Sequence, residues 1–505
     1  MGPRGPNRQL AALLAESGWS AGELARAVNA LGTKYGLRLR YDRTAVAHWL
    51  EGSRPRPPVP GLVAQVFGRR LGRPVRVGET GLESTTTAGA SAEAVLRTGD
   101  PVERLTALCA ADADPARRLA LNREMFTAAD VRLPAWPPAG GPLPGRQPGT
   151  AQPGSTHGGT AQSGTAQSGA AQGGPAQGGA PQGRAARGES AGADARLADM
   201  VTVFAELAAK YGGAHARSAL GAYVADDVAQ RLTASSPGSG TAGPADPAVL
   251  TGSACLMHLL GTMAADSGLP NLGYHCYRAA LDLAHRAEDR NVYAITLRTM
   301  AVLALRLDDL PHARQWSQLA LETAASTPSS HVRTYLYAGR ALVRACDDER
   351  KAALADLLAA ERYHDTEPRR EAADDPLEPF TRYPTTAFHY QRGETLLSLG
   401  DRAQAAAAFQ ESLAVRPPAH HIALVLTHAR LAELLLALGE LEAALDQCAR
   451  ALAHYPYTAS RRTTTALTAL RRVLAPYRRH PQARGVRDQV ARLTHSRPAG
   501  SGGVP

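Results

Sequence analysis

Lysine is almost absent from this chain of 505 residues, which contains only Lys34, Lys210 and Lys351. The remaining basic residues, out of 56 Lys and Arg together, are all arginine. Aromatic residues make up only 5% of the chain, whereas hydrophobic residues make up 44%. A core with this composition must consist mainly of alanine and leucine, which have high helix propensities. The sequence therefore predicts an all-α fold.

Cysteine is also scarce, and no Cys-x-x-Cys pair occurs, which disfavours a zinc ribbon or a redox motif. We expect each cysteine to be a small buried apolar residue. The five are Cys109, Cys255, Cys276, Cys346 and Cys448. No continuous apolar run reaches the roughly 18 residues of a membrane span, and residues 1–10 lack the apolar core of a signal peptide. These absences predict a cytoplasmic protein without membrane contact.

Motifs of catalysis are missing too. The chain has no Walker loop, no nucleophile elbow, no zinc-binding helix motif and no recognisable pair of catalytic carboxylates. His420, His421 and His428 lie close together, but no cysteine or carboxylate accompanies them at a metal-ligand spacing. We therefore expect no enzymatic activity, no cofactor and no metal site.

Charge is unevenly distributed along the chain. The formal net charge is +10, yet residues 1–76 carry +9 and residues 461–505 carry another +9, which leaves −8 for residues 77–460. Basic patches confined to the two ends point to nucleic acid or another acidic partner.

Residues 134–195 contain mostly Gly, Ala, Gln, Ser, Thr and Pro, and glutamine recurs every five residues from Gln162 to Gln182. A period of five fits neither a helix nor a strand, so we predict a disordered Gly/Ala/Gln linker. Upstream, residues 91–133 are predicted to be a short helical segment. Its amphipathic helices, near 100–109 and 115–126, have the apolar residues Leu105, Leu108, Leu119 and Phe126.

Five units of a repeat occupy residues 248–477. Each unit has a small residue, a turn residue, a second small residue and a bulkier residue at nearly constant spacing. The first small residues are Gly261, Ala301, Ala341, Gly393 and Ala432, and the turn residues are Gly268, Asp308, Asp348, Gly400 and Gly439. The second small residues are Gly273, Ala313, Ala353, Ala405 and Ala444, followed by Tyr277, Ser317, Leu357, Phe409 and Cys448. The pattern resembles tetratricopeptide repeats, which implies an α-solenoid of paired antiparallel helices.

The repeat array is predicted to have helical flanks. Residues 196–234 form a helix pair joined at Gly212-Gly213, and residues 365–384 form an acidic, proline-containing loop between the third and fourth units. Leu467, Leu470 and Leu474 share one helix face that caps the array, and residues 478–505 continue as a basic capping segment and tail. For the arginine-rich outer face of this cap, we favour a solvated surface over a nucleic-acid site.

Residues 1–90, which include the basic N-terminal end, are predicted to form a helix-turn-helix domain. Ser20 and Glu23 form a capping box at the start of a second helix. After residues 32–41, Asp42 caps a third helix that ends at Gly52. Val46, Trp49 and Leu50 form the apolar stripe of this third helix.

The opposite side of the third helix is the candidate DNA-reading surface, because such a helix enters the major groove. Arg43, Thr44 and His48 are expected to contact bases or phosphates, and Ser20 a phosphate at the start of its helix. The arginines expected to position the helix on the DNA backbone are Arg38, Arg40, Arg54 and Arg56. A connection of about ten residues is longer than in a simple helix-turn-helix. A basic domain that binds protein is the alternative, and His48 is equally compatible with an unpartnered surface histidine.

Three stretches carry a resemblance to streptomycete helix-turn-helix regulators. They are Gly18-Trp19-Ser20 with Glu23-Leu24-Ala25, Trp49-Leu50-Glu51-Gly52-Ser53-Arg54-Pro55-Arg56 with Pro58-Val59-Pro60, and Phe67-Gly68-Arg69-Arg70-Leu71-Gly72. Together with the repeat array, the chain is similar to negative regulators of differentiation and antibiotic production. The resemblance implies a cytoplasmic transcriptional regulator, and we expect it to act in development and secondary metabolism, including sporulation and antibiotic production. We expect double-stranded DNA, a second copy in a homodimer, and a protein or peptide in the repeat groove as partners. The alternative is a scaffold that does not bind DNA.

Overall fold

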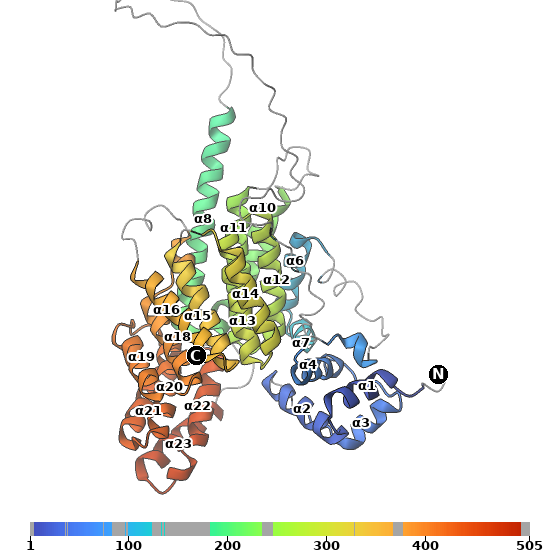
Figure 1. Cartoon of the computed structure of the whole chain (residues 1–505). Coiled ribbons are helices and arrows are strands. Elements are labelled where there is room, and N and C mark those ends of the chain that lie inside the picture. Colours follow the sequence, from blue (N-terminus) through green and yellow to red (C-terminus); the bar gives the residue numbers. More distant parts are fainter. Residues whose placement is uncertain are drawn as a thin grey trace, which may run out of the picture. The chain divides into compact units, whose positions relative to one another are not determined.

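The computed structural model describes residues 5–82 (except 36, 38 and 74), 96, 99–123, 133, 136, 182–234, 246–366 (except 328) and 377–495. Over these residues the chain consists of α-helices with short 3-10 and π segments and no β-strand (Figure 1), which confirms the all-α fold. Helix α8 (Gln182–Tyr211) begins inside the predicted linker 134–195. Most of that prediction lies outside the described residues.

The N-terminal part contains four helices and a 3-10 turn. They are α1 (Arg8–Ser17), α2 (Ala21–Lys34), α3 (Arg43–Leu50), α4 (Val59–Leu71) and η1 (Val77–Thr80). Leu10, Leu24, Val28, Leu62 and Phe67 are fully buried between these helices. Val46 of α3 is fully buried as well, so every helix of this part contributes to one small core.

Five antiparallel helix pairs form the repeat array, as the repeat pattern predicts (Figure 1). The pairs are α11 (Pro247–Asp266) with α12 (Pro270–Arg286), α13 (Arg290–Arg306) with α14 (Leu310–Thr323), α15 (Ser330–Cys346) with α16 (Arg350–Asp365), α18 (Thr385–Ser398) with α19 (Arg402–Ala414), and α20 (His421–Ala437) with α21 (Leu441–His454). All five predicted turn residues have positive φ: 83–85° at the three glycines, and 59° at Asp308 and Asp348. Glycine adopts this backbone without strain and aspartate tolerates it.

Glycine permits the closest approaches between paired helices. A Cβ atom at Gly261 would lie 2.7 Å from Cε1 of Tyr277, and a Cβ atom at Gly393 would lie 2.7 Å from Cε1 of Phe409. Both aromatic side chains are buried. The small residue of the first helix and the bulky residue of the second therefore interlock, as the repeat spacing predicts.

Replacing Gly393 with alanine is expected to destabilise the chain, because the added methyl group meets the closely packed Phe409 ring. Overpacking of this kind costs roughly 1–3 kcal/mol of unfolding free energy. Gly485 is the matched control, since it is also inside a helix but a Cβ atom added there would have nothing within 4 Å. Gly485→Ala should stabilise by about 0.5–1 kcal/mol. Urea denaturation checks both values, and effects of the same sign would contradict the interlocking.

Helix α11 is the one described helix long and apolar enough to pass for a membrane span, but 78% of its apolar window is buried in the fold. Four cysteines are buried as predicted, whereas Cys346 is exposed. The prediction is wrong there because Cys346 is the last residue of α15, where the helix gives way to a turn.

The segment before the linker packs against the first helix pair. Helices α6 (Pro101–Ala113) and α7 (Pro115–Arg123) contact α12, and α6 also contacts α9 (Gly213–Tyr223). Ion pairs Arg104–Asp282 and Arg217–Asp112 join these helices, and the Asn271 side chain donates to the Asn122 carbonyl over 2.7 Å. Leu105 and Leu108 are buried as expected, but Leu119 is 50% exposed because it lies on the outer side of α7; Phe126 lies outside the described residues.

Asp266, at the end of α11, links three distant segments. It is buried, and its carboxylate accepts hydrogen bonds from the Gly213 N–H at 2.8 Å and from the Ser460 hydroxyl at 2.7 Å. Next to it, the Ala459 N–H donates to the Tyr211 carbonyl and the Ala214 N–H donates to the Ala459 carbonyl. The helix junction at Gly212-Gly213 is thereby fixed to both the first and the last part of the array. After this junction the chain continues through α9 into a π segment (Val224–Val228) and α10 (Ala229–Ala234).

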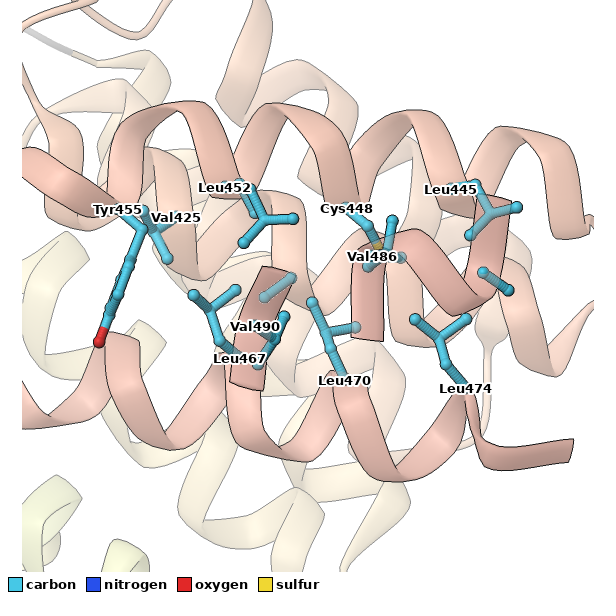
Figure 2. Close-up of a cluster of buried hydrophobic side chains, with 14 residues drawn as sticks. Val425, Leu445, Cys448, Leu452, Tyr455, Leu467, Leu470, Leu474, Val486 and Val490 are labelled. Carbon is cyan, nitrogen blue, oxygen red and sulfur yellow. The ribbon is translucent and has the colours of Figure 1, made fainter. Parts of the chain in front are cut away.

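A terminal helix pair, α22 (Arg461–Val473) and α23 (Pro481–His495), follows the fifth repeat. Figure 2 shows its apolar side packed against α20 and α21. The predicted leucines Leu467, Leu470 and Leu474 are buried there against Leu445 and Leu452. The apolar face of this helix pair is therefore part of the array core.

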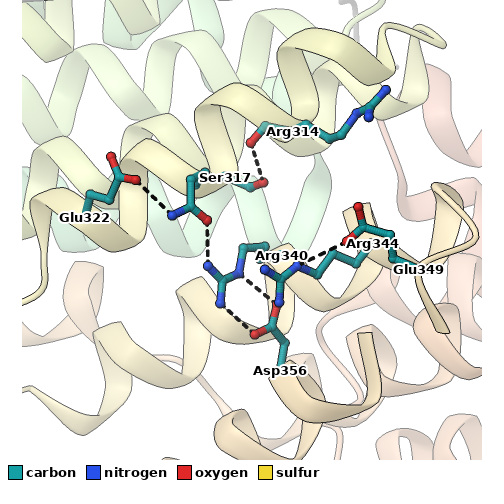
Figure 3. A network of polar contacts seen from close by, with 8 residues as sticks. Arg314, Ser317, Glu322, Arg340, Arg344, Glu349 and Asp356 are labelled. Carbon is teal, nitrogen blue, oxygen red and sulfur yellow. Dashed lines mark hydrogen bonds and ion pairs between the residues drawn. The ribbon is translucent and has the colours of Figure 1, made fainter. Parts of the chain in front are cut away.

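A buried carboxylate holds the third repeat together. Asp356 of α16 accepts a bidentate pair of hydrogen bonds from Arg340 of α15 at 2.8 and 2.7 Å, and a third from Arg344 at 2.8 Å (Figure 3). Arg340 also donates to Gln318 of α14 at 2.7 Å, which extends the network to the second repeat.

Candidate nucleic-acid interface

Helix α2 and helix α3 are joined by residues 35–42, a shorter connection than the predicted 32–41, because α2 continues to Lys34. Gly32 lies inside α2 at the point where the connection folds back. A Cβ atom there would lie 2.5 Å from Cδ1 of Leu39, so any larger residue at position 32 would displace the Leu39 side chain.

The connection is fastened to α2 by Asn29. Its side-chain amide donates to the Tyr41 carbonyl at 2.8 Å, and its side-chain oxygen accepts from the Tyr41 N–H at 2.9 Å. The Tyr41 ring then meets the Trp49 ring edge-on, with centroids 5.1 Å apart. These contacts fix where α3 begins relative to α2.

Helix α3 has one buried and one exposed side. Asp42 caps it by accepting from the Ala45 N–H at 2.9 Å, and Val46 and Trp49 are buried. The candidate contact residues Arg43, Thr44 and His48 are all exposed. The Nδ1 atom of His48 lies 3.3 Å from a carboxylate oxygen of Glu51, so one candidate residue has a local partner.

Arginines on either side of α3 are exposed and unpaired. Arg40, Arg54 and Arg56 are exposed, and neither they nor Arg43 form an ion pair with any residue that the structure describes. Arg38 lies outside the described residues. Unpaired arginines around one helix provide positive potential and free donors for phosphate oxygens.

Two other arginines of the N-terminal part, Arg70 and Arg73, have internal partners. Arg73 donates to Glu16 at 3.0 Å and to Glu79 at 3.1 Å. Arg70 donates to the Ser17 carbonyl at 3.1 Å. Arg73 is therefore compensated by carboxylates, whereas Arg40, Arg43, Arg54 and Arg56 have no ion-pair partner among the described residues.

Ser20 forms the predicted capping box. Its hydroxyl accepts from the Glu23 N–H at 3.3 Å and donates to the Glu23 carboxylate at 2.7 Å, and its own N–H donates to the same carboxylate at 2.8 Å. The backbone hydrogen bond from Ser20 lowers the pKa of Glu23, so this carboxylate is ionised at neutral pH. The negative charge makes the start of α2 a poorer phosphate site than the sequence alone indicates.

Arg26 was not among the sequence candidates, yet it is exposed on α2 and unpaired within the described residues. Arg26 lies outside the buried stripe of Leu24, Ala25 and Val28, and this position in the sequence pattern already indicated that its side chain is exposed. Helical periodicity could therefore have added it to the basic surface.

The first helices of the repeats bury an arginine that has no carboxylate partner among the described residues. Arg298 of α13 is 7% exposed, and its guanidinium carbon lies 3.9 Å from the centre of the Tyr335 ring. It donates to the Gln391 side chain of α18 at 2.9 Å, and no described carboxylate pairs with it. A buried cation without a carboxylate favours an anionic partner.

His258 of α11 borders the same arginine. Burial, and to a lesser degree the charge of Arg298, lower the pKa of His258 to about 3, so the imidazole is neutral at physiological pH. It contacts the Thr296 hydroxyl at 3.0 Å and meets the Phe380 ring edge-on at 5.0 Å between centroids. Arg298 is therefore the charged group at this position.

Among the described residues, no group of three or more His, Cys, Asp or Glu side chains is arranged to hold a metal ion. The His421 and His454 Nδ1 atoms lie 3.1 Å apart, whereas His428 contacts the Gln447 side chain at 2.7 Å.

The N-terminal part of the chain matches a known family. Residues 10–83 match the family described as the SP15 N-terminal domain. None of the curated proteins compared with the chain matches it. The match includes α2, the connection and α3. Every candidate DNA-contact residue named above lies within residues 10–83.

Proposed function

We propose that the chain is a transcriptional regulator that binds double-stranded DNA through α3 and acts in the cytoplasm on genes of development and secondary metabolism. The observation that supports this proposal best is the set of exposed, unpaired arginines around α3: Arg40, Arg43, Arg54 and Arg56. Helix α3 itself is held from behind by Val46 and Trp49, which leaves its outer side free to enter a major groove.

The functional roles of the candidate residues follow from their chemistry. Arg43 and Thr44 lie in the first turn of α3, the part of a reading helix that reaches base edges in helix-turn-helix proteins. Arg40, Arg54 and Arg56 flank this helix in sequence and suit phosphate contacts, which fix orientation without reading sequence. Ser20, Arg38 and His48 are also proposed as contacts, although Ser20 and His48 have local carboxylate partners and Arg38 lies outside the described residues.

The repeat array is proposed to bind a protein or peptide partner and to support a homodimer. Solenoids of stacked helix pairs offer extended surfaces to peptides. Arg298, buried without a carboxylate, favours a partner that presents an anionic group. A dimer would place two copies of α3 on half-sites about one helical turn of DNA apart.

The test is selection of bound genomic fragments followed by footprinting of the full chain. Wild-type protein should protect discrete sites, with affinity that falls steeply as salt increases. Replacing Arg43 and Thr44 with alanine should weaken binding to the selected site by about 2 kcal/mol, or roughly 30-fold, because contacts to base edges are worth 1–3 kcal/mol each.

The matched control is Arg362→Ala with Thr106→Ala, which removes the same two side-chain types from exposed positions on α16 and α6. Its footprint and affinity should equal those of the wild type. An unchanged footprint for the α3 variant would exclude α3 as the reading helix. Partners that survive high salt in complexes free of DNA would instead favour the scaffold function.

A further inference from the structure

The terminal helix pair has the most one-sided charge in the described chain. Residues 461–495 contain a single acidic residue, Asp488. Six arginines there are exposed and form no ion pair with any described residue. They are Arg461, Arg471, Arg472, Arg478, Arg479 and Arg484, which together we call the terminal arginine surface.

Arginines in the preceding repeats are treated differently. Arg340 and Arg344 share Asp356, Arg350 pairs with Asp401 at 2.8 Å, and Arg430 pairs with Glu394 at 2.8 Å. Even the exposed Arg450 on α21 has a partner, Asp446, one helical turn away at 2.9 Å. The repeats therefore compensate many of their cations internally, whereas the six arginines of the terminal arginine surface have no ion-pair partner among the described residues.

The core of the terminal pair fixes these arginines in place. Figure 2 shows Leu467, Leu470, Leu474, Val486 and Val490 turned towards α20 and α21, and all five are buried. The arginines lie on the remaining, solvent-facing sides of the same two helices and on the turn between them. These arginines therefore lie on helices that are folded against the array.

We propose that the terminal arginine surface is a second contact with the phosphate backbone of double-stranded DNA. This inference rests on the proposed function, because it takes double-stranded DNA as the partner of the chain. Guanidinium groups match phosphate geometry through two parallel hydrogen bonds, and six exposed arginines on a helix pair whose one acidic residue is Asp488 suit a polyanion. Contacts of this kind add affinity without reading sequence.

Charge and burial favour DNA over an anionic membrane as the partner. A helix that lies on a membrane needs an exposed apolar face next to its basic one. The apolar faces of α22 and α23 are used in the array core, and Val473 is the one large apolar side chain exposed on the described part of these helices. The surface therefore offers charge but little to insert into lipid.

The test uses the full chain and a short random-sequence DNA duplex. Arg471, Arg478 and Arg484 are each replaced by glutamine, and the logarithm of the binding constant is measured against the logarithm of salt concentration. The slope should become shallower by about 0.9 for each phosphate contact that is lost. Arg362, Arg402 and Arg450, changed together to glutamine, remove equal charge from exposed positions elsewhere and should leave the slope unchanged. Thermal melting confirms that both variants remain folded.

Equal slopes for the two triple variants would overturn the proposal. So would loss of binding to vesicles of phosphatidylcholine and phosphatidylserine in the terminal variant while its DNA slope stays at the wild-type value. The experiment distinguishes failure of the proposed function from failure of this inference. If no genomic fragment is bound specifically, a shallower slope on random DNA still supports the terminal surface; if specific binding is intact and the slope does not change, this inference alone is wrong.

Discussion

Replacing Asp356 with alanine is expected to lower the free energy of unfolding by about 4 kcal/mol, since breaking a buried ion pair from one side costs about 3–5 kcal/mol. Asp356 is 3% exposed and neutralises both Arg340 and Arg344. Without it, two guanidinium groups remain between α15 and α16, with side-chain exposures of 15% and 27%. Urea denaturation followed by circular dichroism measures the loss.

Asp446→Ala is the matched control. Asp446 also accepts from an arginine, Arg450, but both side chains are more than half exposed, so solvent screens their attraction. Its removal should cost no more than about 0.5 kcal/mol. Similar losses for the two aspartates would mean that the network in the third repeat has no special weight in stability.

Replacing Asp266 with alanine is expected to cost about 3 kcal/mol of unfolding free energy. The Gly213 N–H and the Ser460 hydroxyl would both lose their acceptor in a buried setting, and each unsatisfied donor costs roughly 1–3 kcal/mol. The effect should be local at first, because Asp266 holds the α8–α9 junction and the start of α22 to the end of α11.

Two measurements check this prediction. Denaturation gives the total loss, with Asp488→Ala, at an exposed position, as a control expected within about 0.5 kcal/mol of the wild type. Hydrogen exchange should show faster exchange at the amides of Ala214 and Ala459, which bond across the same junction. Unchanged exchange at those amides would contradict the linking role of Asp266.

The repeat architecture could be predicted well from sequence because it depends on local and regularly spaced choices. Gly393, Gly400 and Phe409 determine a close approach, a left-handed turn and the ring that fills the approach, all within one helix pair. The same reasoning correctly gave the exposed side of α3, since helical period alone places Thr44 and His48 opposite the buried Val46.

Sequence reasoning failed where the outcome depended on how far an element extends or what lies beside it. Helix α2 continues through Gly32 to Lys34 because the connection folds back over that glycine and Asn29 binds it, a contact between residues 12 positions apart. Cys346 and Leu119 are exposed because of their places at a helix end and on an outer side, which composition does not reveal.

The sequence by itself determined the helical class, the phase of the five repeats and the basic character of both ends, since each follows from residue type and spacing. Only the tertiary structure decided which arginines remain free. Arg340 and Arg478 look alike in sequence, but one faces a buried carboxylate on the neighbouring helix and the other faces solvent without a described partner. Compensation of charge depends on residues brought together by folding, and for this chain it separates the arginines that stabilise the array from those that we propose to contact DNA.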